Sequence, residues 1–242
     1  MPIDRRDVMK GALAGVVFSP IRAPAAIVSG KLPWSADAGA PPQPVSPGSW
    51  QFFTADEATA IEAIVNRLIP VDPQTPGGKD AGCAVYLDRQ LAGPYGKADG
   101  LYRDGPFTSG ATQQGDQSPL TPAARCREGL AELDRGCRAA HSGRAFAALP
   151  EQDQDAVLSS LEKGEAPFDS AGSKAFFEQL LKTTHEGFFA DPIYGGNRDM
   201  CAWKMIGFPG ARYDYREWVE RHNERYPLPP VSIGNPRGRG RP

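Results

Sequence analysis

The chain has 242 residues, which leaves room for one domain of about 150–200 residues plus terminal segments. Its hydrophobic content of 40% suffices for a core, while 27 glycines and 24 prolines predict much ordered loop or long extended ends. The net charge of −2 provides no basic surface of the kind that nucleic acid attracts, so no nucleic-acid partner is expected.

Residues 1–25 have the features of an export signal of the twin-arginine (Tat) type. Arg5 and Arg6 precede Lys10 and a short apolar run over residues 11–19. The run is too short for a membrane-spanning helix, which takes about 20 apolar residues. Because the Tat route carries folded cargo, the signal implies that the protein either holds a cofactor or travels with a partner that does.

A helical domain is predicted over residues 50–226, after a proline-rich linker or surface arm over residues 26–49. Thr54 and Glu57 form a capping box at the start of its first helix, which Pro70 ends. Further helices are predicted over residues 82–91, 122–141, 151–163, 174–188 (capped by Ser173), 197–206 and 213–226. Since no segment alternates with period two, the fold class is all-α: a single irregular domain of five to seven helices with long loops and extended terminal arms.

The long loop over residues 92–120 is polar, but it contains three aromatic residues, Tyr95, Tyr102 and Phe107. A loop of this length is usually either disordered or functional. The first interpretation is a disordered loop. The second is an arm that places its aromatic rings in pockets of a partner protein.

Residues 187–210, called here the motif segment, are the least generic part of the chain. They combine five glycines, two prolines and five aromatic residues, which predicts a precisely shaped backbone. The candidate partner contacts in it are Tyr194, Gly195, Gly196, Asn197, Trp203 and Phe208. Trp203 is expected to pack on the chain's own core and Tyr194 to be more exposed. The tail over residues 227–242 is interpreted as solvated, with a contact of its basic end to anionic lipid or an acidic partner as the alternative.

Four cysteines, Cys83, Cys126, Cys137 and Cys201, would reach an oxidising compartment after export. Cys126 and Cys137 are eleven residues apart in one predicted helix, about 16 Å along its axis, which is too far for a disulfide. Any internal pairing is therefore expected to join Cys83 or Cys201 to one of those two, and pairing with another subunit stays open.

The sequence offers no arrangement of residues for catalysis, cofactor binding or metal binding. Its three histidines have no second ligand at i+3 or i+4, and there is no GxSxG, phosphate-binding loop, CxxC or CxxCH motif. Asp72, Asp80, Asp88, Asp191 and Asp199 are mostly expected at turns or helix caps. No catalytic, cofactor-binding or metal-ligating residue is therefore predicted.

The chain resembles the gluconate 2-dehydrogenase subunit 3 family over roughly residues 50–215. The resemblance is carried by FFTADEATAIEAIVNRLIPVD (52–72), DPIYGGN (191–197), Trp203 and GFPG (207–210), together with the twin arginines. It implies the small subunit of a periplasmic sugar or polyol dehydrogenase, such as a gluconate, fructose, sorbitol or glucose dehydrogenase, associated with the inner membrane through its complex.

In such a complex, the resemblance implies, a large subunit contains FAD and a multihaem cytochrome c passes electrons to quinone. The small subunit carries no redox centre. It acts as a chaperone that binds the FAD subunit and escorts it through the Tat translocase. Two alternatives stay open: a free-standing periplasmic enzyme with an unrecognised site, and a structural protein that an uncleaved signal tethers to the membrane.

Overall fold

The computed structural model describes residues 44–45, 48–101, 105–108, 110–111, 113, 118–165, 167–168, 170–212 and 215–234. All of them belong to one unit of the chain, Ser35–Pro242, and the other unit, Met1–Trp34, lies outside the described residues. Arg5, Arg6, Tyr102 and residues 235–242 also lie outside them, so the predictions that concern these residues stay sequence-based.

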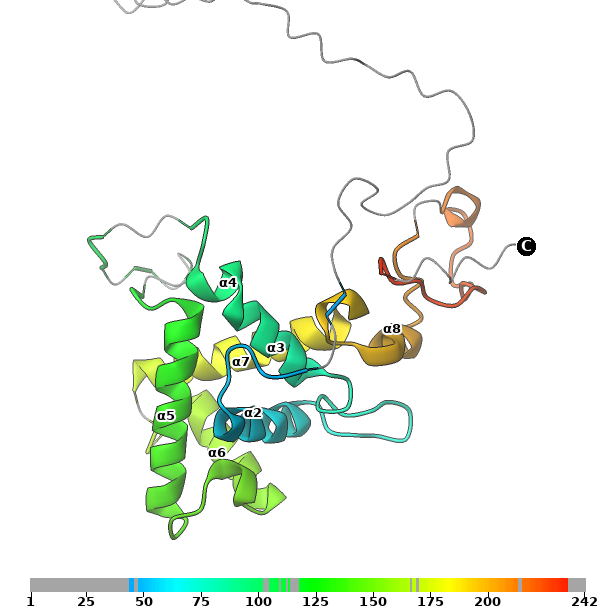
Figure 1. Ribbon diagram of the computed structural model, residues 1–242. Coiled ribbons are helices and arrows are strands. Elements are labelled where there is room, and N and C mark those ends of the chain that lie inside the picture. Colours follow the sequence, from blue (N-terminus) through cyan, green and yellow to red (C-terminus); the bar gives the residue numbers. More distant parts are fainter. Residues whose placement is uncertain are drawn as a thin grey trace, which may run out of the picture. The chain divides into compact units, whose positions relative to one another are not determined.

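The described residues form seven α-helices and no strand. The helices are α2 (Ala55–Leu68), α3 (Cys83–Ala92), α4 (Pro94–Lys97), α5 (Pro122–Ala140), α6 (Glu151–Lys163), α7 (Ala171–Phe189) and α8 (Cys201–Ile206) (Figure 1). Four short 3-10 helices accompany them: η2 (Phe146–Ala148), η3 (Pro192–Tyr194), η4 (Arg198–Met200) and η5 (Arg216–Trp218). The predicted all-α fold is confirmed. None of the described helices is both long and apolar enough to cross a membrane.

Local sequence signals set the ends of the main helices. Thr54 Oγ1 accepts a hydrogen bond from the Glu57 amide at 3.3 Å, and the Glu57 carboxylate accepts one from the Thr54 amide at 2.8 Å, so the capping box begins α2 as predicted. Thr121 caps α5 in the same way, accepting from the Ala124 amide at 3.1 Å. Gly164 ends α6 in a left-handed conformation with φ of 68°.

The predicted Ser173 cap is wrong by one turn. Ser170 caps α7, and its hydroxyl accepts from the Ser173 amide at 3.0 Å. The Ser173 side chain is buried and donates to the Glu132 carboxylate of α5 at 2.8 Å. The Ser170 hydroxyl also donates to Glu132, at 3.3 Å, so both serines connect α7 to α5 while Ser170 caps α7.

The last two predicted helices are shorter than expected. Regular helix after the glycine turn begins only at Cys201, because Asn197, Asp199 and Met200 have left-handed φ of 45°, 54° and 56°. Met200 rather than Asp199 occupies the cap position of α8. Within the described part of residues 213–226 only η5 is helical. The ring of Trp218 lies 5.0 Å from that of Tyr226, whereas eight residues of helix would separate them by about 12 Å along the axis.

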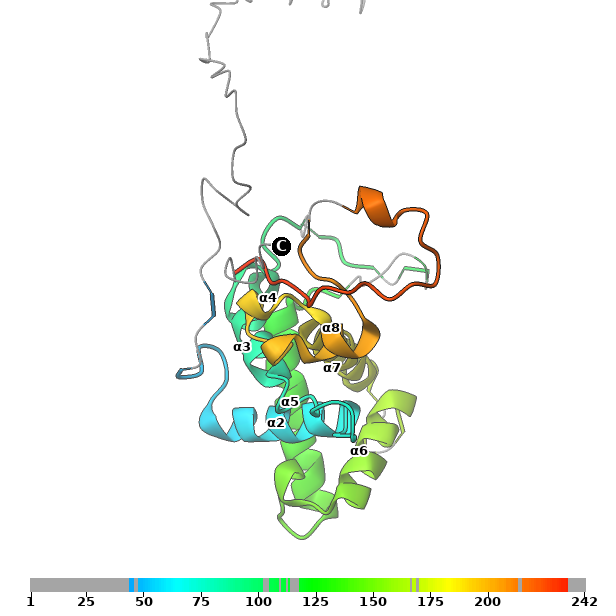
Figure 2. The same ribbon diagram turned by 90° about the vertical axis from the view of Figure 1, so that its right-hand side faces the viewer.

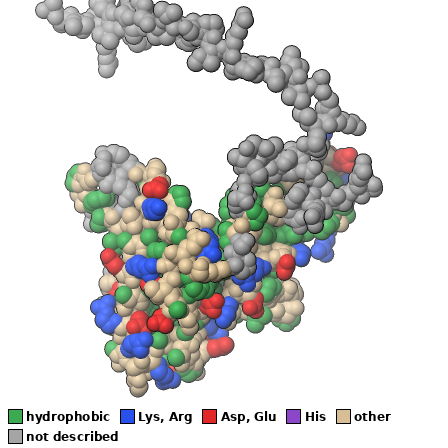
Figure 3. All heavy atoms as spheres, viewed as in Figure 1, with side chains coloured by type: hydrophobic (Ala, Val, Ile, Leu, Met, Phe, Trp, Pro, Cys, Tyr) green, Lys and Arg blue, Asp and Glu red, His purple; other side chains and the backbone are tan. Residues whose placement is uncertain are grey.

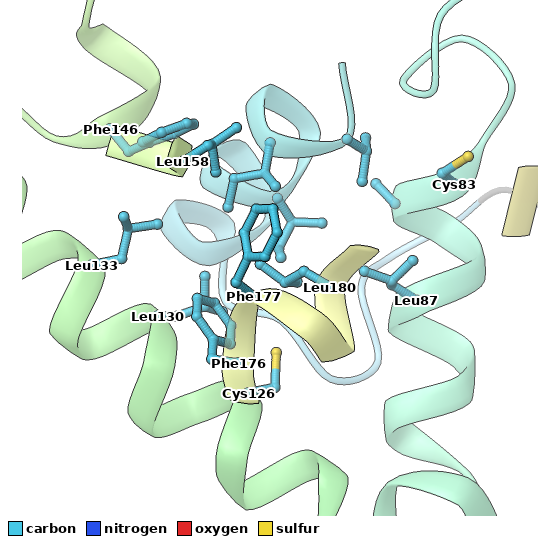
Figure 4. Packing of buried hydrophobic residues seen from close by; sticks show 14 of the residues in the cluster. Cys83, Leu87, Cys126, Leu130, Leu133, Phe146, Leu158, Phe176, Phe177 and Leu180 are labelled. Carbon is cyan, nitrogen blue, oxygen red and sulfur yellow. The ribbon is translucent and has the colours of Figure 1, made fainter. Parts of the chain in front are cut away.

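Helix α7 is central to the packing and contacts α3, α5 and α6 (Figures 1 and 2). Figure 4 shows Phe176, Phe177 and Leu180 of α7 meeting Leu130 of α5 and Leu87 of α3. Gly129 allows this approach, since a Cβ built on it would lie 2.2 Å from the Phe176 ring. Phe176 is fully buried, and replacing such a side chain by alanine typically costs about 3–5 kcal/mol.

Asp88 attaches the segment before α2 to helix α3. Its buried carboxylate accepts hydrogen bonds from three consecutive amides, those of Gln51 at 2.9 Å, Phe52 at 2.9 Å and Phe53 at 3.0 Å. It also forms an ion pair with Arg89. The expectation of a turn or cap role is wrong for Asp88, because its position inside α3 lets it bind a segment that is distant in the sequence.

The beginning of the loop over residues 92–120 is ordered as α4. Tyr95 of this helix is half-buried and packs on the core, so it is a poor candidate for contact with a partner. Burial raises the pKa of its hydroxyl. Gly96 is required here because a Cβ would lie 1.8 Å from the Leu91 carbonyl oxygen. Phe107, further along the loop, is 49% exposed.

Candidate interaction surface

The motif segment comprises the last residues of α7, a glycine turn over residues 190–200, and α8, and the glycine turn packs against the end of α7. Gly195 has a left-handed φ of 97°, which favours glycine. A Cβ on Gly196 would lie 2.1 Å from the carbonyl oxygen of Gly187, and one on Gly187 would lie 2.8 Å from the ring of Tyr86. Backbone therefore packs directly on backbone, and these glycines leave no room for a side chain.

Two buried polar side chains hold the turn in place. Asn197 is fully buried; its amide group donates to the Ala190 carbonyl oxygen at 2.9 Å and its side-chain oxygen accepts from the Ala202 amide at 2.9 Å. The indole nitrogen of Trp203 donates to the Phe189 carbonyl oxygen at 2.8 Å. The base of the turn is thus rigidly connected to both α7 and α8.

Large apolar side chains are exposed along the motif segment. Of the ten large hydrophobic residues that are exposed in the described part of the chain, five lie in the motif segment: Phe189, Tyr194, Met205, Ile206 and Phe208. They are 41–57% exposed, and we call them the docking face. Phe208 stacks edge-on against the buried Trp203 at 5.1 Å, which fixes the ring while leaving 44% of the residue exposed.

The opposite character is seen over α2, α5 and α6. On the side of the molecule in Figure 3, side chains of both charges are interspersed over these helices. Several are paired, for example Arg67 of α2 with Asp155 of α6 at 2.6 Å. This pair is bidentate, since Arg67 Nε also donates to Asp155 Oδ1 at 2.7 Å, so it joins the two helices more firmly than an ordinary surface ion pair.

The structure separates the predicted contact residues into two groups. Tyr194 is 41% exposed and Trp203 only 6%, as expected. Gly195, Gly196 and Asn197 are buried like Trp203, so they shape the surface without offering side chains to a partner. Phe208 remains a contact candidate. Phe189, Met205 and Ile206 were missed, and their grouping around Trp203 in the family-like motif is the only sequence signal for them.

Asp191 attaches a C-terminal strap, residues 228–234, to the motif segment. Its buried carboxylate accepts from the Ile193 amide at 3.0 Å, the Ser232 hydroxyl at 2.6 Å and the Ile233 amide at 2.8 Å. The interpretation of the tail as solvated is therefore wrong for this part, since Ser232 is buried. Val45 approaches from the N-terminal side and donates its amide to the Ile193 carbonyl oxygen at 2.8 Å.

Two clefts on the surface are lined by charged or titratable side chains. The larger, about 300 Å³, lies between α2 and α6, and its charges are paired with each other: Arg67 with Glu151 at 2.7 Å and Lys79 with Glu62 at 3.0 Å. The smaller, about 140 Å³, is lined by Cys137 and His141. Burial raises the pKa of Cys137 to about 11, so its thiol is protonated at neutral pH and a weak nucleophile.

The four cysteines are all free thiols in this structure. None of the pairings expected from the sequence is present. Cys83 and Cys126 are fully buried, and burial raises the pKa of each to about 12. Among the described residues, no group of three His, Cys, Asp or Glu side chains is arranged to hold a metal ion.

Comparison with known proteins identifies one family. The family model described as Gluconate 2-dehydrogenase subunit 3 matches residues 55–210, which is more than half of the chain. The match begins with α2 and ends at the last residue of the motif segment, so the strap lies beyond it. Searches of the curated proteins and of the solved structures gave no match.

Proposed function

This chain belongs to the gluconate 2-dehydrogenase subunit 3 family, and we propose that it is the non-catalytic small subunit of a sugar or polyol dehydrogenase complex. Its task is to assemble with the FAD-containing catalytic subunit, to stabilise that subunit and to escort it through Tat export. The complex then works in the periplasm at the inner membrane, where it passes electrons to a multihaem cytochrome c and quinone. FAD and haem belong to the partner subunits.

The docking face is the observation that supports this proposal most strongly. Half of the large exposed hydrophobic residues that the structure describes lie in the motif segment, and exposed apolar clusters of this kind mark protein interfaces. The buried Asn197 and Trp203 hold the face in a fixed shape, so docking orders little additional chain. A rigid, apolar and chemically inert surface suits a structural subunit better than an enzyme.

The docking face alone is too small for a permanent complex. Stable hetero-complexes commonly bury about 2,000 Å² or more, and five half-exposed side chains supply only part of that area. Phe107 at 49% exposure and Leu101 at 66% provide further exposed apolar side chains on the loop after α4. We propose that this loop contacts the same partner, in keeping with an aromatic docking arm.

Export of the pair tests the proposal. In the native host, the tagged chain is replaced by the Arg5→Lys/Arg6→Lys variant, and the matched control is Arg22→Lys, an arginine of the same signal region outside the pair. Cell fractions are probed for this chain and for the FAD protein that co-purifies with it. We expect the double variant to hold both proteins in the cytoplasm and the control to export both.

Two outcomes contradict the proposal. If only this chain is retained while the FAD protein is exported in active form, the escort role is wrong. If the purified lone chain oxidises sugars or polyols with an artificial electron acceptor, or shows a visible cofactor spectrum, the free-standing enzyme is the correct interpretation.

A further inference from the structure

Two cysteines occupy equivalent places at the starts of two helices, and the residues that precede these helices are in contact. Cys83 is the first residue of α3 and Cys201 the first residue of α8, and each follows a residue in left-handed conformation, Gly82 and Met200. The two helices come from widely separated parts of the chain, so the spacing of the cysteines in the sequence does not indicate that their positions are similar.

Backbone contacts hold these helix starts together. The Arg198 amide donates to the Ala81 carbonyl oxygen at 3.0 Å, and a Cβ on Gly82 would lie 2.5 Å from the carbonyl oxygen of Gly195. Cys83 directly follows Gly82, and Cys201 lies three residues after Arg198. Cys201 is also one of the neighbours that raise the pKa of Cys83, in keeping with the contacts between the two helix starts.

The surroundings of the two sulfur atoms differ in access. Cys83 is fully buried, whereas Cys201 is partly exposed and its thiol donates a weak hydrogen bond to the Asn197 side-chain oxygen at 3.7 Å. Cys126 and Cys137 lie elsewhere, inside α5, and are both fully buried in the core (Figure 4 shows Cys83 and Cys126 well apart). An oxidant can therefore reach the sulfur atom of Cys201 more readily than that of Cys83.

We propose that Cys83 and Cys201 form a disulfide bond that joins α3 to the motif segment once the protein reaches an oxidising compartment. This step rests on the proposed export. A disulfide-containing oxidant first accepts attack by the Cys201 thiolate, giving a mixed disulfide and releasing one thiol of the oxidant. The Cys83 thiolate then attacks the Cys201 sulfur, forming the internal bond and releasing the second thiol, so that two thiol protons and two electrons leave the protein.

The second step is expected to be slow and sensitive to pH. Burial, together with the neighbouring Cys201, raises the pKa of Cys83 to about 12, so the reactive thiolate is scarce at neutral pH. At pH values below this pKa, each increase of one pH unit raises the thiolate fraction about tenfold, and the rate of disulfide closure should rise with it. Once formed, the bond closes a long loop and lowers the entropy of the unfolded chain.

Peptide mass spectrometry under non-reducing conditions tests the proposal with two preparations of the full chain. One is purified from the periplasm of the native host, and the other is purified reduced and then incubated in glutathione redox buffer. We expect a linked pair of peptides containing Cys83 and Cys201, with Cys126 and Cys137 alkylated as free thiols. Formation of this pair in glutathione buffer when no chain is exported would support the bond while contradicting the proposed function.

Four free thiols in both preparations, or a bond to Cys126, Cys137 or another protein, would overturn the proposal. Thermal unfolding gives a second readout: reductant should lower the Tm of the oxidised wild type by roughly 5–15 °C and leave the Cys201→Ser variant unchanged. Cys201 is partly exposed, so its serine variant should fold. Equal sensitivity of the variant and the wild type to reductant would also refute the bond.

Discussion

Replacing Ile206 by aspartate should detach the partner subunit without unfolding this chain. Ile206 lies at the end of α8 and is 57% exposed, the largest exposed fraction of the docking face. Burying an isoleucine completely is worth about 1.5–3 kcal/mol, so docking can still gain roughly 1–1.5 kcal/mol at this side chain. A carboxylate left without a partner in the interface costs at least about 1–3 kcal/mol in addition, because this range applies to uncharged polar groups. The sum, about 3 kcal/mol, corresponds to an increase in Kd of roughly 100-fold.

The assay is the affinity between the tagged chain and the FAD-containing subunit, measured by biolayer interferometry, with Tm measured in parallel. The matched control is Val71→Asp, which places the same charge at a side chain that is 66% exposed and outside the motif segment. Both variants should keep the wild-type Tm within about 2 °C, because surface substitutions usually change stability by less than about 0.5 kcal/mol. Wild-type affinity of a folded Ile206→Asp variant would refute the docking face.

Three further substitutions test the structure beneath the docking face and at the first helix. Gly196→Ala should lower Tm by roughly 2–10 °C in a thermal melt, because its Cβ would lie 2.1 Å from the Gly187 carbonyl oxygen; the control Gly172→Ala, whose nearest neighbour outside the helix backbone is 3.5 Å away, should leave Tm equal or higher. Asp191→Ala should abolish the protection of the Ile233 amide in hydrogen exchange while leaving protection in α5 intact; full retained protection would show that the strap does not depend on this carboxylate. Glu57→Gln should flatten acid unfolding between about pH 5 and pH 3. Burial by itself would raise the pKa of Glu57, but hydrogen bonds from Arg127 and from Thr54 lower this pKa overall. The stability that the Glu57 carboxylate contributes is therefore fully present above its usual pKa of 4.5 and is lost as pH falls through the lower pKa of the folded state. An unchanged acid transition in Glu57→Gln would contradict this role.

The helices of the main bundle were predictable because their ends depend on residues a few positions apart. Thr54 and Glu57 are separated by less than one helical turn, and Gly164 directly follows α6. Such caps satisfy helix amides or carbonyls that are otherwise unpaired, whatever the rest of the fold does. The family could be recognised for a similar reason, since the residues of the motif segment have a fixed order and spacing within one contiguous stretch.

The roles of three polar residues could not be predicted in this way. Ser173 looks like a cap in the sequence, but α7 begins one turn earlier with Ser170 as its cap, and the buried Ser173 hydroxyl donates to Glu132 of α5. Asp88 and Asp191 look like local turn formers. Asp191 does cap η3 by accepting from the Ile193 amide, as expected, but both carboxylates also accept hydrogen bonds from amides in a distant part of the chain. Their partners are brought near only when the chain is folded, so no local pattern could show them.

The sequence by itself determined the all-α class, the main helices and the family, because these depend on periodicity, caps and a contiguous motif. Tertiary packing decided the exposure of Phe189 and Phe208, whereas the burial of Trp203 and the exposure of Tyr194 agree with the expectation from the sequence. Trp203 and Phe208 are near each other in the sequence and are both large aromatic residues. The position of the Phe189 carbonyl oxygen, at the end of α7, turns the Trp203 indole inward while Phe208 stays at the surface. Exposure depends on what packs against a side chain from distant parts of the chain, and for this surface that neighbour is the end of α7.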